Sequence, residues 1–317
     1  MRSQSIQVWA GVLVAGLIGA LPGFGTVGPD PAATNLAQVT VTIRARHHGA
    51  YPVVGPDDLR VYEDNQSRPV VSWVAAKKQS SPLDLTIVLD DSIMARTGLQ
   101  FQDLEEFFPT LPAGTRVRIA YASYGGNDIA QDFTTDYRLA GEALRIPLGY
   151  MAAGGSIYDS VSDLIKKWPK DGNRREILLI SDGIDITDGL VDSEPNLNME
   201  LQQAIGAAQS ADVPIYTIFS RGPRVLDRNW FLLDNGQGCL LRLTTETGGQ
   251  SYFQGTHTPL AFAPYLQQFA NDLQHQYVLT FQALASPKNG YQSLRVTTEV
   301  PHVRLDAPAR VFVPKAG

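Results

Sequence analysis

Oxygen-bearing side chains occur in three separate segments of this sequence, each next to an apolar pattern. Asp90 and Ser92 follow one apolar run. Ser156 precedes a helical pattern, and Asp182 follows a second apolar run. Carboxylate and hydroxyl oxygens are hard ligands, and magnesium takes one or two carboxylates while keeping several waters. If these four side chains meet, they would form a magnesium site with an open position for a carboxylate from a partner.

The pattern around these residues predicts strands that alternate with helices. Residues 85–89 and 177–180 are continuous apolar runs, as expected of strands that are covered on both faces. Other strands are expected at 116–122, 213–219 and 251–253, and helices at 99–108, 157–168, 201–208 and 262–273. Such alternation implies parallel pairing through right-handed crossovers. We therefore expect residues 83–275 to form a doubly wound, mostly parallel α/β domain that binds ligands at the carboxyl ends of its strands.

Glycines mark two turns in this region. Gly125 and Gly126 predict a hairpin that leads to a short edge strand near Phe133. Gly248 predicts the carboxyl-terminal cap of a helix just before the last strand of the domain.

Both ends of the chain show the alternation of apolar and polar residues that is typical of strands with one buried face. These strands are expected at 39–43, 59–62 and 70–74 and again at 277–281, 294–298 and 311–313. A small sheet with open edges is not stable alone. We therefore predict that the strands of 38–80 pair with those of 276–317 in one small β-sandwich, with the α/β domain between them in the sequence.

The sequence resembles a von Willebrand factor A-type (VWA) domain at the candidate metal ligands. That family has Asp-x-Ser-x-Ser, then a Thr, then an Asp, and the matching residues here are Asp90, Ser92, Ser156 and Asp182. Met94 stands where the last Ser belongs, and a thioether is a weak ligand for magnesium. Ile93 replaces the small residue usual before that Ser and is expected to crowd the loop. The resemblance implies a magnesium site, and the departures leave open a vestigial site that is free of metal.

The resemblance extends to the VWA-related proteins of Acidobacteria, which have a leader, a strand-rich segment, the VWA domain and a strand-rich tail. It covers residues 38–314, and it is carried by the segments 56–64, 89–92, 180–183, 247–253 and 275–281 in that order. It implies the fold described above and, as in VWA domains generally, a role in adhesion or protein–protein contact.

The amino-terminal residues predict export. Arg2 is the only charge before Asp30, and residues 8–20 are apolar. This is the pattern of a signal peptide over residues 1–25, although an uncleaved membrane anchor stays open as an alternative. Residues 26–37 are rich in Gly, Pro, Ala and Thr and read as a linker. We expect the rest of the chain in the periplasm, in the cell envelope or outside the cell.

Composition argues against several other functions. The formal net charge of −6 disfavours a nucleic-acid partner. Cys239 is the only cysteine, which excludes an internal disulfide and a cysteine-based zinc site, and we expect it to be buried. His47 and His48 are expected in a solvated loop or at a strand end, and Asp185 and Asp188 in a solvated acidic loop. No nucleophile elbow or zinc-hydrolase motif is present.

Two functions fit these observations. The first is an exported, non-enzymatic binding protein that engages a protein or cell-surface ligand, with magnesium as the candidate cofactor. The second is a structural scaffold protein of the envelope whose site has lost its metal. Contact with a membrane is expected only through an uncleaved leader.

Overall fold

The computed structural model describes residues 35–45, 51–78, 82–149, 155–222, 229–284 and 290–313, which lie in one compact unit, Ala33–Gly317. The predicted leader, nearly all of the predicted linker, and His47, His48 and Gly154 fall outside the described residues. Within the described residues, no helix is both long and apolar enough to cross a membrane.

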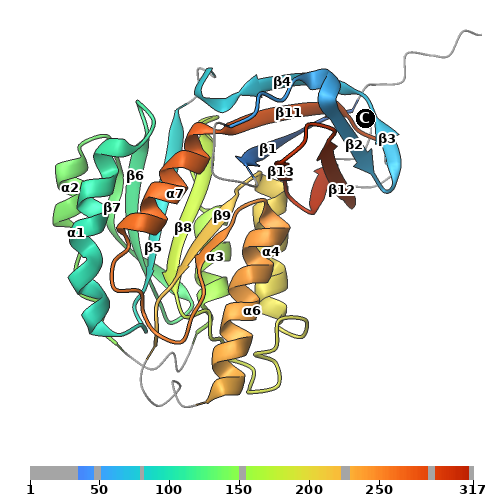
Figure 1. The fold of residues 1–317 in the computed structure, drawn as a ribbon. Coiled ribbons are helices and arrows are strands. Elements are labelled where there is room, and N and C mark those ends of the chain that lie inside the picture. Colours follow the sequence, from blue (N-terminus) through green and yellow to red (C-terminus); the bar gives the residue numbers. More distant parts are fainter. Residues whose placement is uncertain are drawn as a thin grey trace, which may run out of the picture. The chain divides into compact units, whose positions relative to one another are not determined.

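A six-stranded sheet forms the centre of the α/β domain (Figure 1). Its strand order is β10-β9-β8-β5-β6-β7, parallel from β10 to β6, with β7 antiparallel at the edge. The strands are β5 Leu83–Asp90, β6 Arg116–Ser123, β7 Gly126–Thr134, β8 Arg174–Ser181, β9 Ile215–Phe219 and β10 Ser251–Phe253. The predicted hairpin is present, with Gly125 at φ 73°, and the edge strand near Phe133 extends over nine residues.

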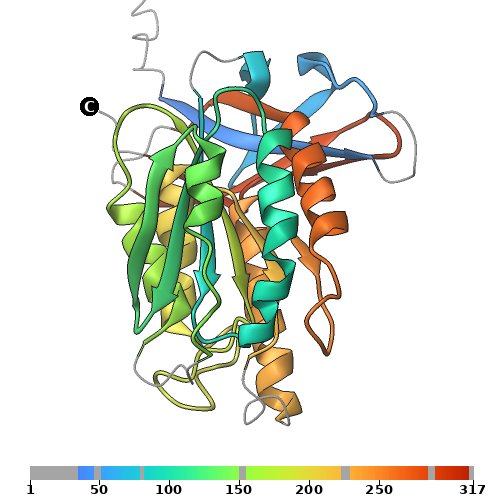
Figure 2. The ribbon, with the colours of Figure 1, turned by 90° about the vertical axis from the view of Figure 1, so that its left-hand side faces the viewer.

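Helices cover both faces of this sheet (Figures 1 and 2). On one face lie α1 Phe101–Phe107, α2 Tyr137–Glu142 and α7 Ala263–Gln274, and on the other α3 Ile157–Lys166, α4 Met199–Ala211 and α6 Trp230–Thr247. All eight residues of β5 are buried, and Ile87 and Val88 belong to the cores on opposite faces. The continuous apolar run therefore reports a strand covered on both sides.

Helix boundaries differ in places from the sequence prediction. The helix expected at 99–108 is divided into the 3-10 turn Ala95–Gln100, α1, and a second 3-10 turn, Phe108–Thr110. The sequence analysis predicted the carboxyl-terminal cap of α6 at Gly248, which has φ 85°, but not the helix itself. Gly236 and Gly238 weaken its helical signal, because glycine is a poor helix former.

The terminal strands form two four-stranded sheets with the orders β13-β1-β11-β4 and β14-β12-β2-β3. Their members are β1 Leu36–Ala45, β2 Leu59–Glu63, β3 Gln66–Arg68, β4 Val70–Ala75, β11 Gln276–Gln282, β12 Gly290–Thr298, β13 Val303–Asp306 and β14 Arg310–Val313, with 3-10 turns at Pro56–Asp58 and Ala76–Lys78. Both sheets contribute to one apolar core. The predicted fold class, a mostly parallel α/β sheet with a sandwich of terminal strands, is confirmed. The linker prediction was wrong at its end, since β1 begins at Leu36.

Strand β1 joins the sandwich to the amino end of the α/β domain. Thr40 donates two hydrogen bonds to the carboxylate of Asp212, at 2.9 and 3.1 Å. Two residues along, the Thr42 hydroxyl lies 3.3 Å from the hydroxyl of Tyr216 on β9. These contacts place polar groups of the sandwich inside the α/β domain rather than on its surface.

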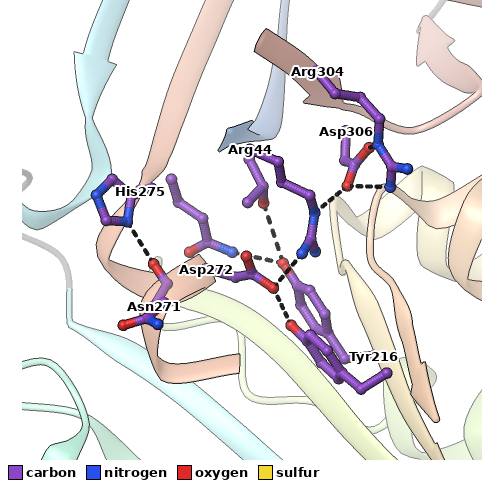
Figure 3. Close-up of polar contacts among 10 residues, drawn as sticks. Arg44, Tyr216, Asn271, Asp272, His275, Arg304 and Asp306 are labelled. Atoms are coloured by element: carbon purple, nitrogen blue, oxygen red, sulfur yellow. Dashed lines mark hydrogen bonds and ion pairs between the residues drawn. The ribbon is translucent and has the colours of Figure 1, made fainter. Parts of the chain in front are cut away.

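Arg44 is the charged centre of this junction (Figure 3). Its Nη1 lies 2.7 Å from Oδ2 of Asp272 on α7, and its Nε donates to Asp306 on β13. The hydroxyl of Tyr252 also donates to Asp272. Burial lowers the pKa of Arg44, but the carboxylates of Asp272 and Asp306 outweigh that effect and raise it. The guanidinium therefore stays charged in a nearly dry environment.

Replacing Arg44 by Ala should cost about 3–5 kcal/mol of unfolding free energy, because it leaves the Asp272 carboxylate buried without its cation. Chemical denaturation measures this loss. Arg304→Ala is a matched control, since Arg304 also pairs with Asp306 but has 55% of its side chain exposed, and it should cost less than about 1 kcal/mol. Equal losses in the two variants would contradict this role for Arg44.

Glu176, near the amino end of β8, is buried with few polar partners. Neither carboxylate oxygen has a hydrogen-bond partner among the described residues, and Arg174 Nη1 lies 3.6 Å away. Burial raises the pKa of Glu176 to about 7, although the nearby side chains of Arg174 and Gln276 act to lower it. The ionised side chain is therefore disfavoured in the folded protein.

Stability should fall as pH rises from 4.5 to about 7, because in this window the unfolded chain releases the Glu176 proton while the folded protein keeps it. The loss from this group should be about 3 kcal/mol. Glu176→Gln should flatten the slope in pH-dependent denaturation curves, whereas Glu105→Gln, at an exposed position, should leave it unchanged. An unaltered slope in Glu176→Gln would refute the assignment.

Candidate functional site

Asp90 ends strand β5, and the carboxylate is held by three hydrogen bonds. Its Oδ1 accepts from the backbone N of Ser92 at 2.9 Å and from the Ser92 hydroxyl at 2.6 Å. Its Oδ2 accepts from the Ser181 hydroxyl at 2.5 Å. Because β5 and β8 are parallel neighbours, Ser181 at the end of β8 is positioned to reach Asp90. The sequence analysis missed this contact.

Burial raises the pKa of Asp90 above its ordinary value. The hydrogen bonds from Ser181 and Ser92 act in the opposite direction, and the neighbouring charge of Asp91 adds to the increase. Burial disfavours the ionised carboxylate, and a cation nearby would lower the pKa of Asp90 and stabilise its charged form.

Ser156 is the amino-terminal cap of α3. Its Oγ accepts from the backbone N of Tyr158 at 3.1 Å and donates to the carboxylate of Asp185. Asn198, the cap of α4, also donates to Asp185, at 3.2 Å. Asp185 was expected in a solvated acidic loop, and this was wrong: the residue is 4% exposed because it links the first turns of two helices.

Asp182 follows β8 at the same edge of the sheet. Its Oδ1 accepts from the backbone N of Ile184 at 2.9 Å, and its Oδ2 lies against the backbone of Gly222. The position of Gly222 leaves no space for a Cβ, which would lie 2.0 Å from that oxygen. The carboxylate is therefore packed between two loops.

A small cavity of about 30 Å³ lies between these loops. Its volume suits water or a single small ion and is far below the roughly 300 Å³ of a metabolite pocket. It is lined by Asp90, Asp91, Ser92, Ala122, Ser123, Tyr124, Gly125, Gly155, Ser156, Ile157, Ser160 and Ile184. The structure thus brings three of the four predicted ligands, Asp90, Ser92 and Ser156, to one cavity, whereas Asp182 is not among the residues that line it.

The donor set of this cavity fits a cation that keeps water ligands. Among the predicted ligands it offers one carboxylate, of Asp90, and two hydroxyls, of Ser92 and Ser156, and Ser123 and Ser160 add two further hydroxyls to the lining. Across the described ranges, no group of three or more His, Cys, Asp or Glu side chains could hold a metal ion, so any binding here depends on hydroxyl oxygens. Asp91 borders the cavity, but its carboxylate pairs with Arg145 through two contacts of 2.8 Å.

The two departures from the VWA pattern have different consequences. Ile93 is fully buried in the core on the α1 face, so the loop accommodates it by packing it inward. Met94 is half-buried, and its backbone N donates to the carbonyl of Arg221 at 3.0 Å. Its thioether replaces an oxygen ligand and offers the cavity no hard donor.

Two glycines allow α6 to approach the loop after β8. A Cβ on Gly183 would lie 2.4 Å from the carbonyl oxygen of Gly236, and a Cβ on Gly236 would lie 2.5 Å from that of Asp182. Gly183 also has φ 71°, which disfavours other residues. This close packing fixes the backbone on which Asp182 sits.

No family model and no curated protein matches this sequence. Among solved structures, it is similar to the conserved hypothetical protein BatB from Bacteroides thetaiotaomicron, with 14% identity and a TM-score of 0.44 over 60% of this chain and 97% of that chain. A von Willebrand factor type A protein from Catenulispora acidiphila has 11% identity and a TM-score of 0.37 over 90% and 75% of the two chains. The vWF domain of the type V pili tip protein Mfa5 from Porphyromonas gingivalis has 13% identity and a TM-score of 0.38 over 61% and 95%. The structural neighbours thus include VWA domains, while the relation to the Acidobacterial group stays a prediction.

Replacing Gly183 by Ala should lower the unfolding free energy by about 2–4 kcal/mol, because it adds a clash with Gly236 to the strain of a positive φ. Gly172→Ala is a matched control: Gly172 has φ 81°, but a Cβ there would have no neighbour within 4 Å. Gly172→Ala should introduce the backbone strain without a clash, and it should lower the unfolding free energy by about 1 kcal/mol. Thermal unfolding of both variants measures the difference, and similar losses would argue against the close packing.

Proposed function

We propose that this chain is an exported binding protein whose carboxyl-edge loops engage another protein, with a magnesium ion held at the cavity. The observation that carries the proposal is the meeting of Asp90, Ser92 and Ser156 around a cavity of about 30 Å³, which suits an ion and its waters. The buried Asp90 carboxylate supports it, since a cation would offset the cost of its burial.

In this proposal Asp90, Ser92 and Ser156 hold the ion, and Asp182 supports it from the neighbouring loop. The ion would supply a positive charge that attracts a carboxylate of the partner. The protein's own contribution is rigid placement: Ser181 orients Asp90, Asp185 orients Ser156, and the packing of Gly183 fixes the loop of Asp182.

A metal-free scaffold is the second candidate, and a specific observation favours it. Asp90 accepts three hydrogen bonds and Ser156 makes two, so these side chains are satisfied by the protein itself. With Met94 in place of a third hydroxyl, the loops would hold together without an ion. Partners would then bind through the sandwich or the sheet edges.

Magnesium binding should raise the melting temperature relative to protein in EDTA. At a hundredfold excess over the dissociation constant, the gain is about 2.7 kcal/mol, or roughly 4–5 °C for a chain of this size. Asp90→Asn removes the charge of the carboxylate that lines the cavity and should abolish the increase, whereas Asp57→Ala, an exposed carboxylate in the sandwich region, should preserve it. Differential scanning calorimetry provides the measurement.

Met94→Ser discriminates between the two candidates. If the native site binds magnesium, the added hydroxyl should increase the stabilisation further. If the wild type shows no response to millimolar magnesium and Met94→Ser does, the metal-free scaffold is the correct account and the proposed ion site is rejected.

A further inference from the structure

Large apolar side chains are exposed in segments that follow the carboxyl ends of the strands of the six-stranded sheet. Leu99 follows β5 and is 82% exposed, Trp230 begins α6 and is 66% exposed, and Leu260 follows β10 and is 99% exposed. Val191, in the segment after β8, is also exposed. We name these four residues the apolar rim. Each of them lies in a segment that follows the carboxyl end of a parallel strand, namely β5, β8, β9 or β10.

Hydrogen bonds and close packing join the segments that carry the apolar rim. The hydroxyl of Thr97 lies 2.8 Å from that of Ser220, and Ser220 lies 3.4 Å from the hydroxyl of Thr258, which connects the loops of Leu99 and Leu260. Gln237 on α6 donates to the carbonyl of Gly255 at 2.9 Å, which adds the segment of Trp230. Asn235 on α6 donates to the Ser193 hydroxyl at 2.8 Å, which adds the segment of Val191. Hydrogen bonds therefore join all four segments that carry the rim.

A hollow of about 530 Å³ lies beside Leu260 on this surface. Its apolar lining includes Phe253, Pro259 and Tyr265. This volume accommodates one or two large side chains of a partner, and a pocket that takes such an anchor is typical of the energetic centre of a protein interface.

Carboxylates gather in the first turns of α3 and α4 and in the segment after β8. Asp159 on α3, Glu200 on α4 and Asp188 in the segment after β8 form no ion pair with any described residue. Burial and then the charges of Asp185 and Asp188 raise the pKa of Asp159, although Lys166 acts to lower it, and burial and then Asp188 raise the pKa of Glu200. We name Asp159, Asp188 and Glu200 the acidic cluster, whose charges repel one another.

We infer that the apolar rim and the acidic cluster together dock a protein segment that carries aromatic or aliphatic side chains next to Lys or Arg. Exposed apolar surface marks a binding face, and the carboxylates select a partner of opposite charge. The same carboxylates would repel anionic lipid and a second copy of this edge. This inference rests on the proposed function only in placing the partner at the carboxyl edge, and it needs no metal.

The test is a selection from displayed short random peptides on the immobilised full chain in EDTA. Peptides that combine net positive charge with aromatic or aliphatic residues should be enriched. A synthesised winner should bind about tenfold or more weakly to Trp230→Ser/Leu260→Ser and to Asp159→Asn/Asp188→Asn/Glu200→Gln, as measured by fluorescence anisotropy. Val53→Ser/Glu299→Gln, exposed in the sandwich region, is the matched control and should bind as the wild type does.

Three results would overturn the inference. The first is a selection in EDTA that enriches no basic peptide, while a parallel selection in magnesium enriches acidic peptides that fail to bind Asp90→Asn; it would leave the proposed function intact. The second is that no peptide is enriched more strongly on the wild type than on Trp230→Ser/Leu260→Ser. The third is binding of neutral phosphatidylcholine vesicles that is lost in Trp230→Ser/Leu260→Ser, since it would assign the rim to a membrane. Stabilisation by magnesium is measured separately, so failure of this inference and failure of the ion site are distinguishable.

Discussion

Strand β5 is buried on both faces along its whole length, and this constraint decides where polar chemistry can occur in the molecule. A sheet covered by helices on both sides leaves only its two ends for polar groups. The amino end is taken by the contacts of β1 with Asp212, Tyr216 and Asp272. The carboxyl end therefore remains as the edge where oxygen ligands, exposed loops and a partner can meet.

At the carboxyl edge, the side-chain oxygens of Asp90 and Ser156 have two possible sets of partners, namely protein hydrogen-bond donors and acceptors or a bound cation. Asp90 and Ser156 can be bonded by neighbouring side chains or can contribute to a cation site. Ser181 and Asp185 satisfy these oxygen atoms by hydrogen bonds without an ion. A cation would nevertheless stabilise the ionised form of Asp90, which burial disfavours. The balance depends on Met94, where an oxygen ligand is missing.

The junction at the other end of the sheet uses the order of the chain. Strands β4 and β11 are antiparallel neighbours in the sandwich, and they stand immediately before and after the segments that build the α/β domain. Buried polar groups such as Arg44 and Tyr216 then join the two parts. Because a buried charge is tolerated only with its partner in place, these contacts fix how β1 meets the helices and strands beside it.

Periodicity and chain order in the sequence were enough to predict the fold class, because continuous apolar runs and alternating runs report directly how many faces of a strand are buried. The strand ends then placed Asp90, Ser92, Ser156 and Asp182 at one edge of the sheet. Helix α6 escaped prediction, apart from its cap at Gly248, because its glycines serve close packing rather than helix propensity.

The tertiary structure alone decided the roles of individual side chains. Asp185 became a buried partner of Ser156, Ile93 packed into the core, and Asp182 lay outside the lining of the cavity. Neighbours in space that are distant in sequence make these choices, and no local pattern records them. The sequence by itself determined which edge carries the oxygen atoms, and only the packing of distant loops determined which of those atoms face the same cavity.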